Sequence, residues 1–203
     1  QSVVDTFFLK WWLLVPASFS VTLTGENNTS LYGKPLSIQQ FVRCHLEYAS
    51  PVWSPWNTAD INQLENIQVK AVKMINGLEG LSYPEKLTAL NLESLTERRT
   101  KADLLLVYKI IKGFCDVDKN TWFSLVGASD RNTRLTSCPM NIKQQRFRTD
   151  MRKHFFSNRV VNYWNSLPVD VKMSNSISEF KNKLKKITIH LEWIAIYLFS
   201  LIL

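Results

Sequence analysis

The chain of 203 residues contains few glycines and prolines, six and seven respectively, and only three cysteines. With so few glycines and prolines and 45% hydrophobic residues, a collagen-like or disordered chain is excluded. Cys44, Cys115 and Cys138 are odd in number, lie far apart and form no C-x-x-C pair. This excludes a disulfide framework and a zinc module, and it is typical of a reducing, intracellular location, nuclear or cytoplasmic.

The sequence also lacks the short motifs of common enzyme classes. It contains no G-x-x-x-x-G-K-[ST], no G-x-G-x-x-G, no H-E-x-x-H and no G-x-S-x-G. Asp116, Asp118 and Asn120 resemble the start of a calcium-binding loop. However, Thr121 stands where that loop requires glycine, and Gly127 stands where it requires glutamate. No catalytic residue, metal ligand or cofactor is predicted in this chain.

Positive charge is concentrated in the last third of the chain. Residues 1–130 carry 12 basic and 13 acidic side chains, a net charge of −1, whereas residues 131–203 carry 13 and 4, a net of +9. Eight cations between residues 131 and 159 are opposed only by Asp150. They are Arg131, Arg134, Lys143, Arg146, Arg148, Arg152, Lys153 and Arg159. Such a cluster favours the phosphate backbone of RNA or DNA as a partner, bound largely without regard to sequence.

Aromatic side chains are interleaved with these cations and allow two interpretations. The aromatic residues of this stretch are Phe147, His154, Phe155 and Phe156. Side chains of this kind can stack on unpaired bases of a nucleic acid. Alternatively, helical spacing places Phe155 and Phe156 on one buried face with Val160, Tyr163 and Trp164. The spacing favours the buried face.

Hydrophobic residues recur at steps of three and four, which predicts a mostly α-helical protein with no competing strand pattern. The clearest helix spans residues 57–77, with Asn57 or Thr58 as its N-cap and Gly77 as its stop. A second helical pattern covers residues 150–165 and ends before Pro168. The intervening region, residues 114–145, is expected to contain one short turn around 121–126.

Three capping boxes, each a serine followed by glutamate three residues later, predict further helix starts at Ser82, Ser94 and Ser176. The helix from Ser94 is expected to run to residue 112 and to stop at Gly113. Its core face is predicted to consist of Leu95, Ala102, Leu105, Leu106 and Ile110. Its solvent side is predicted to carry Arg98, Arg99 and Lys101.

Six short stretches follow one another in a definite order. They are VRCHLEYASPVWSPW (42–56), SYPEKL (82–87), LTERR (95–99), DLLLVYK (103–109), RKHFFSNRVVNYWNSLP (152–168) and FKNKL (180–184). In this order they resemble the part of non-LTR retrotransposon reverse transcriptases that follows the catalytic palm, in the chicken-repeat-1-like and jockey-like branches. Cys44 departs from the family pattern, which has proline at that place. The resemblance covers roughly residues 38–186.

The resemblance implies a helical thumb-like bundle followed by a basic helical C-terminal extension. The corresponding regions are a thumb-like part (38–113), a basic connecting part (114–145) and a basic helical part (146–186). Residues 1–37 match nothing in the family and are expected to be poorly ordered or aberrant. Residues 187–203 form an apolar tail that is also foreign to it.

The polymerase chemistry of the family is not implied for this chain. In the family, palm aspartates of a [FY]-A-D-D motif hold two Mg²⁺ ions. Here Asp60 is followed by Ile61, and Asp103 is followed by Leu104. The resemblance therefore implies a remnant of an RNA-directed DNA polymerase that contacts RNA or DNA but lacks the polymerase site. Mg²⁺ is expected only for the intact parent polymerase.

The apolar tail supports an alternative from a different class. Residues 187–203 are a minimal length for a membrane span, and Glu192 near the middle is costly there. The chain is then a small helical interaction protein or a tail-anchored membrane protein, with the lysines between 181 and 186 against anionic lipid. A reading frame without a stable product is a third alternative.

Overall fold

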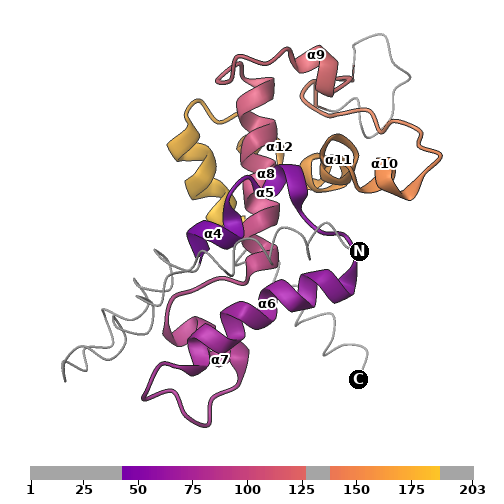
Figure 1. The fold of residues 1–203 in the computed structure, drawn as a ribbon. Helices are drawn as coiled ribbons and strands as arrows, with labels where there is room; N and C mark the ends of the chain where they lie inside the picture. Colours follow the sequence, from indigo (N-terminus) through magenta and orange to yellow (C-terminus); the bar gives the residue numbers. More distant parts are fainter. Residues whose placement is uncertain (1–42, 127–137, 188–203) are drawn as a thin grey trace, which may run out of the picture. The chain divides into compact units, whose positions relative to one another are not determined.

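The structure, a computed structural model, describes residues 43–126 and 138–187, and helices joined by turns predominate in them (Figure 1). This confirms the predicted mostly α-helical class. The labelled helices are α4 (Cys44–Glu47), α5 (Ser50–Trp53), α6 (Thr58–Lys73), α7 (Tyr83–Ala89), α8 (Leu95–Ile111), α9 (Lys119–Trp122), α10 (Asp150–His154), α11 (Phe156–Ser166) and α12 (Val169–Lys172). Residues 177–187 form a further helix. Within the described residues the only β pairing is an antiparallel bridge between Leu125 and Ile142.

The described residues divide into two compact units. Residues 43–48 and 55–95 belong to the first, and residues 49–54, 96–126 and 138–187 to the second. The division therefore falls near residue 95, at the start of α8. The physical reason is that the apolar residues of α8 share one buried cluster with α11 and the 177–187 helix.

The first unit is built around α6 and α7, and its helix starts follow the predicted caps. The Asn57 side chain accepts a hydrogen bond from the Ala59 N–H at 3.1 Å, which fixes the start of α6. The carboxylate of Glu85 accepts from the N–H and the hydroxyl of Ser82, at 2.7 and 2.6 Å. The helix α6 ends at Lys73, short of the predicted stop at Gly77. The core of this unit consists of Val72, Ile75, Leu78, Leu87, Leu90 and Leu92.

A buried polar network, which the sequence did not predict, lies in the first unit. The buried Gln68 accepts from Arg43 Nε at 2.9 Å and donates to the Tyr83 hydroxyl at 2.9 Å. Gln68 and Arg43 also both donate to the backbone oxygen of Glu93. The Tyr83 hydroxyl donates to Glu65 Oε1 at 2.5 Å. The network thus joins α6 and α7 to the segments that precede α4 and α8.

Because of Tyr83, the stability of this unit is expected to fall as the pH rises into the alkaline range. Burial, and next the hydrogen bond to Glu65, raise the pKa of Tyr83 above its ordinary value of 10.0. Above pH 10 the unfolded chain therefore loses this proton before the folded one, so stability is lost as the pH rises. We expect the advantage of the wild type over Tyr83→Phe to shrink there by up to about 1.4 kcal/mol per pH unit. Urea unfolding of both proteins at pH 8 and 11 measures this, and a pH-independent difference contradicts it.

The second unit packs α8 against α11 and the 177–187 helix. The rings of Tyr108 and Phe180 stack with centroids 4.2 Å apart and planes at 13°. Trp164 is fully buried and donates its indole N–H to the Met140 oxygen at 2.7 Å. Asn165 exchanges two hydrogen bonds with the backbone of Ile142, at 3.0 and 2.9 Å, and so ties α11 to the chain beside the β bridge.

The buried face of α8 differs in part from the prediction. Leu95 and Ile110 are buried as expected. Leu105 and Leu106 are only half-buried, whereas the core also contains Leu104, Val107, Tyr108 and Ile111. The prediction failed because α8 is apolar on almost every side between residues 104 and 111. When a helix is apolar on nearly all sides, the buried side is decided by the elements that pack against it and not by its own sequence pattern.

Arg99, predicted on the solvent side of α8, is buried with 4% of its surface exposed. It lies one turn before Asp103, and its positive charge acts on that buried carboxylate. The predicted stop of α8 is confirmed. Gly113 has a φ of 75°, and the Phe114 N–H reaches back to the Lys109 oxygen at 2.8 Å, as in a Schellman motif.

The helix predicted over residues 150–165 is interrupted at Phe155. This residue has extended backbone, with φ −64° and ψ 147°, and separates α10 from α11. Its oxygen accepts from the N–H groups of Asn158 and Arg159 at 2.9 and 3.0 Å, which starts α11. The Asn158 side chain donates to the Arg152 oxygen at 2.6 Å, which satisfies the end of α10. The break turns Phe155 out of the buried face that continuous helical spacing had predicted. Tyr163, predicted on the same face, is also exposed, at 56%, whereas Phe156, Val160 and Trp164 are buried as expected.

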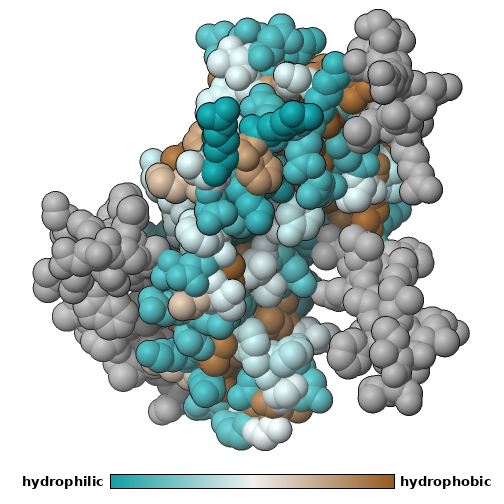
Figure 2. Space-filling model, turned by 90° about the vertical axis from the view of Figure 1, so that its right-hand side faces the viewer, coloured by the Kyte–Doolittle hydropathy of each residue, from teal (hydrophilic) through white to brown (hydrophobic). Residues whose placement is uncertain are grey.

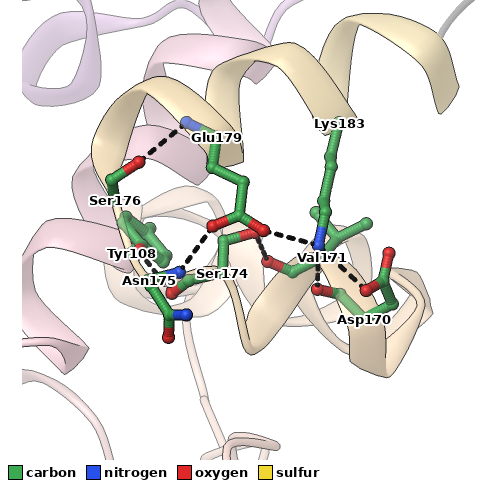
Figure 3. A network of polar contacts seen from close by, with 8 residues as sticks. All are labelled: Tyr108, Asp170, Val171, Ser174, Asn175, Ser176, Glu179 and Lys183. Carbon is green, nitrogen blue, oxygen red and sulfur yellow. Dashed lines mark hydrogen bonds and ion pairs between the residues drawn. The ribbon is translucent and has the colours of Figure 1, made fainter.

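A polar network holds the end of the second unit (Figure 3). The Tyr108 hydroxyl donates to the Ser174 oxygen at 2.7 Å. The predicted cap of the last helix is present, because Ser176 Oγ accepts from the Glu179 N–H at 3.1 Å. Lys183 forms ion pairs of 2.9 Å with Glu179 and Asp170. These contacts bind α12 to the helix that follows it.

Candidate nucleic-acid interface

The predicted cation cluster includes a run of chain that we call the basic segment, residues 143–153. It carries five cations against one acid, a net charge of +4 over 11 residues. It follows the β bridge, where the Lys143 N–H donates to the Ser124 oxygen at 2.8 Å, and it enters α10 after a bend at 148–149. Its cations are all exposed: Lys143, Arg146, Arg148, Arg152 and Lys153.

The local structure follows from the residues at the start of α10. Thr149 has extended backbone, and its hydroxyl accepts from the Arg152 N–H at 3.4 Å. Asp150 stands in the first turn and the basic Arg152 and Lys153 in the last, which matches the helix dipole. The first four residues of α10, 150–153, are all exposed.

Four exposed cations of the basic segment, Arg146, Arg148, Arg152 and Lys153, form no ion pair with the residues that the structure describes. Arg152 makes a long contact of 3.4 Å to the Gln145 amide oxygen and lies over the ring of Phe155. Uncompensated charges this close repel one another, and a polyanion that binds them relieves that repulsion.

Arg159, predicted as a phosphate contact with the others, has a different position. Its Nε and one terminal nitrogen hold both oxygens of Asp103 at 2.9 and 3.0 Å. Its terminal nitrogens also donate to the oxygens of Pro51 and His154, at 2.8 and 3.3 Å. Burial raises the pKa of Asp103, and the hydrogen bonds and charge of Arg159 oppose this rise. Because its donors are occupied inside the second unit, we leave Arg159 out of the interface.

Two lysines that follow the basic segment in sequence, Lys172 and Lys183, are also held within the fold. The amine of the buried Lys172 donates to Asn141 Oδ1 at 2.8 Å and to the Asn165 oxygen at 3.0 Å. Burial lowers the pKa of Lys172. Lys183 is paired with acids, as described above. Arg131 and Arg134 lie outside the described residues, so the structure places neither of them.

The interleaved aromatic residues separate into buried and exposed ones. Phe156 is buried and His154 is half-buried, whereas Phe147 and Phe155 are 37% and 42% exposed. Trp122 of α9, which the sequence reasoning missed, lies nearly parallel to Phe155, with ring centroids 6.1 Å apart and planes at 9°. On the face drawn in Figure 2, hydrophobic side chains reach the surface in small patches among hydrophilic ones.

The described residues contain neither a metal-ligating cluster nor a helix able to span a membrane. No three His, Cys, Asp or Glu side chains there come together in a way that holds a metal ion. None of the helices formed by residues 43–126 and 138–187 has the length and apolar character needed to cross a membrane. The predicted apolar tail from residue 188 onward and the N-terminal segment lie outside the described residues.

The structure thus defines a small helical protein with an exposed segment of cations and aromatic rings. Comparison of the chain with protein-family models, curated proteins and solved structures finds no match. The relationship to reverse transcriptases therefore stays a hypothesis that rests on the ordered stretches of sequence.

Proposed function

We propose that this chain is a non-catalytic remnant of a non-LTR retrotransposon reverse transcriptase that binds RNA or DNA through its basic segment. One observation carries the binding proposal. Arg146, Arg148, Arg152 and Lys153 are exposed and form no ion pair with described residues, whereas Arg159 and Lys183 are paired with acids. The cations best suited to a polyanion are thus adjacent in one segment.

The positions of three of the six stretches, DLLLVYK, the stretch at 152–168 and FKNKL, support the proposed origin. Asp103 of DLLLVYK pairs with Arg159 of the stretch at 152–168. Tyr108 of the same DLLLVYK stacks on Phe180 of FKNKL, and Trp164 is fully buried. Stretches far apart in the sequence therefore share one core. The residues that these stretches share with the family therefore build a folded core. A region that positions a nucleic acid for a separate catalytic palm requires such a core.

The proposed binding is electrostatic and largely independent of sequence. Exposed arginines and lysines contact phosphates, which all RNA and DNA strands share whatever their sequence. Affinity is therefore expected to fall as salt is added, because counterions released from the strand are the main driving force.

The direct test is fluorescence anisotropy with the purified 203-residue chain and labelled 20-nucleotide single-stranded RNA, single-stranded DNA and duplex DNA. At about 50 mM salt we expect binding with a dissociation constant of about 10 μM or tighter for each probe. An uncharged peptide nucleic acid of the same sequence is the control and is expected not to bind. Absence of binding to every charged probe at about 100 μM protein contradicts the proposal.

A further inference from the structure

Phe155 is an exposed aromatic residue that follows the basic segment directly, two residues after Lys153. It occupies the extended junction between α10 and α11, so its side chain belongs to neither helix face. Its ring is nearly half exposed, and Arg152 and Lys153 precede it within one turn. An apolar ring exposed beside cations is costly to leave in water and is well placed for a ligand that is both planar and anionic.

The ring of Phe155 has two neighbours, the ring of Trp122 and the guanidinium of Arg152. Trp122 lies nearly parallel to it at 6.1 Å, and the backbone oxygen of Phe155 is fixed by two N–H groups of α11. The guanidinium of Arg152 lies over the ring, 5.6 Å from its centroid. Apart from the ring, this guanidinium contacts Gln145 at the long distance of 3.4 Å, and the Arg152 side chain is exposed. The ring thus has an aromatic neighbour in Trp122, while the cation over it is weakly held.

We propose that Phe155 is a stacking platform for an unpaired base and that the basic segment prefers single-stranded nucleic acid. The inference rests on the proposed nucleic-acid binding and names its substrate class. An incoming base takes the place of the Arg152 guanidinium, because base–aromatic stacking is stronger than an exposed cation–π contact. The displaced guanidinium then contacts a phosphate next to that base, so the exchange retains its favourable charge interaction.

A single strand satisfies this arrangement and a duplex does not. The bases of a duplex are stacked on one another and present only their edges, so no base face reaches a protein ring without unstacking. In a single strand every base has an accessible face, and stacking is therefore tolerant of sequence. Duplex binding then uses the cations alone, and single-strand binding uses the cations and Phe155 together.

The experiment compares two single strands of equal charge, a 12-nucleotide DNA with all its bases and the same strand made of abasic sites. Anisotropy at about 50 mM salt measures the affinity of the wild-type chain, Phe155→Leu and Phe155→Tyr for both strands. We expect the wild type to prefer the strand with bases about tenfold. Phe155→Leu is expected to lose this preference while it keeps the affinity for the abasic strand, and Phe155→Tyr, which keeps a ring, is expected to retain the preference.

Tyr163 of α11 provides a matched control, because it is an exposed aromatic residue of the same unit that lies ten residues after the end of the basic segment, whereas Phe155 lies two residues after it. Tyr163→Leu is expected to keep the preference. Equal wild-type affinity for the two strands overturns the stacking inference and leaves the proposed nucleic-acid binding intact. A preference that persists in Phe155→Leu also overturns the inference. Binding to neither strand overturns both.

Discussion

Neutralising four cations of the basic segment is expected to weaken binding to a single-stranded nucleic acid about 600-fold at 0.1 M salt. The variant replaces Arg146, Arg148, Arg152 and Lys153 by glutamine. Each phosphate contact to a single strand contributes about 0.7 to the salt exponent, which corresponds to about fivefold in affinity at 0.1 M salt. Because all four side chains are exposed, the fold is expected to be retained, and circular dichroism with urea unfolding verifies this.

A second fourfold variant separates the segment from the overall charge of the protein. It replaces exposed lysines elsewhere in the chain by glutamine, at Lys70, Lys73, Lys119 and Lys181. The loss of charge is identical, but these lysines lie in other elements, so we expect the affinity to fall less than about tenfold. If both variants lose affinity equally, binding depends on a diffuse field and the assignment to the basic segment is contradicted.

Removing Asp103 is expected to destabilise the second unit by about 3–5 kcal/mol. Asp103→Ala leaves the guanidinium of Arg159 without its bidentate partner, in a position where the side chains of Arg159 and Asp103 are only 17% and 10% exposed. An exposed ion pair contributes about 1 kcal/mol at most, so the size of the loss reports how far this pair is removed from water. Urea unfolding of wild type and variant at pH 7 measures it.

The matched control replaces both partners by apolar residues. Asp103→Leu combined with Arg159→Met removes the two charges together, and we expect its stability to lie closer to wild type than that of either single variant. Because the guanidinium of Arg159 is occupied by Asp103 inside the second unit, the double variant is also expected to bind nucleic acid within about twofold of wild type. The structural role of the Asp103–Arg159 pair is contradicted if Asp103→Ala lowers the free energy of unfolding by less than about 0.5 kcal/mol. It is also contradicted if the double variant loses much of its affinity for nucleic acid.

Helix starts were predictable because their signals are local. The Asn57 cap and the Ser82–Glu85 box each lie within four residues of the N–H groups that they satisfy. The break at Phe155 was not predictable in this way. It depends on Asn158 capping the end of α10, and the placement of the ring depends on Trp122, 33 residues earlier in the chain.

The candidate site shows the same limit. Sequence composition located the basic segment, since a cluster of like charges needs no knowledge of packing. It could not distinguish Arg159 from Arg152, because the difference is made by Asp103, which is 56 residues away from Arg159 in the chain. Likewise, the helical spacing that placed Phe155 in the core was correct for Phe156 and Trp164 but assumed one unbroken helix.

The most direct test of the account is the salt dependence of single-strand binding in the wild type and in the fourfold variant of the basic segment. The logarithm of the binding constant is measured against the logarithm of the salt concentration from about 50 to 300 mM. If four phosphates are contacted by these four cations, the wild-type slope is steeper than that of the variant by about 3. Equal slopes for the two proteins contradict the claim that the basic segment is where this protein binds nucleic acid.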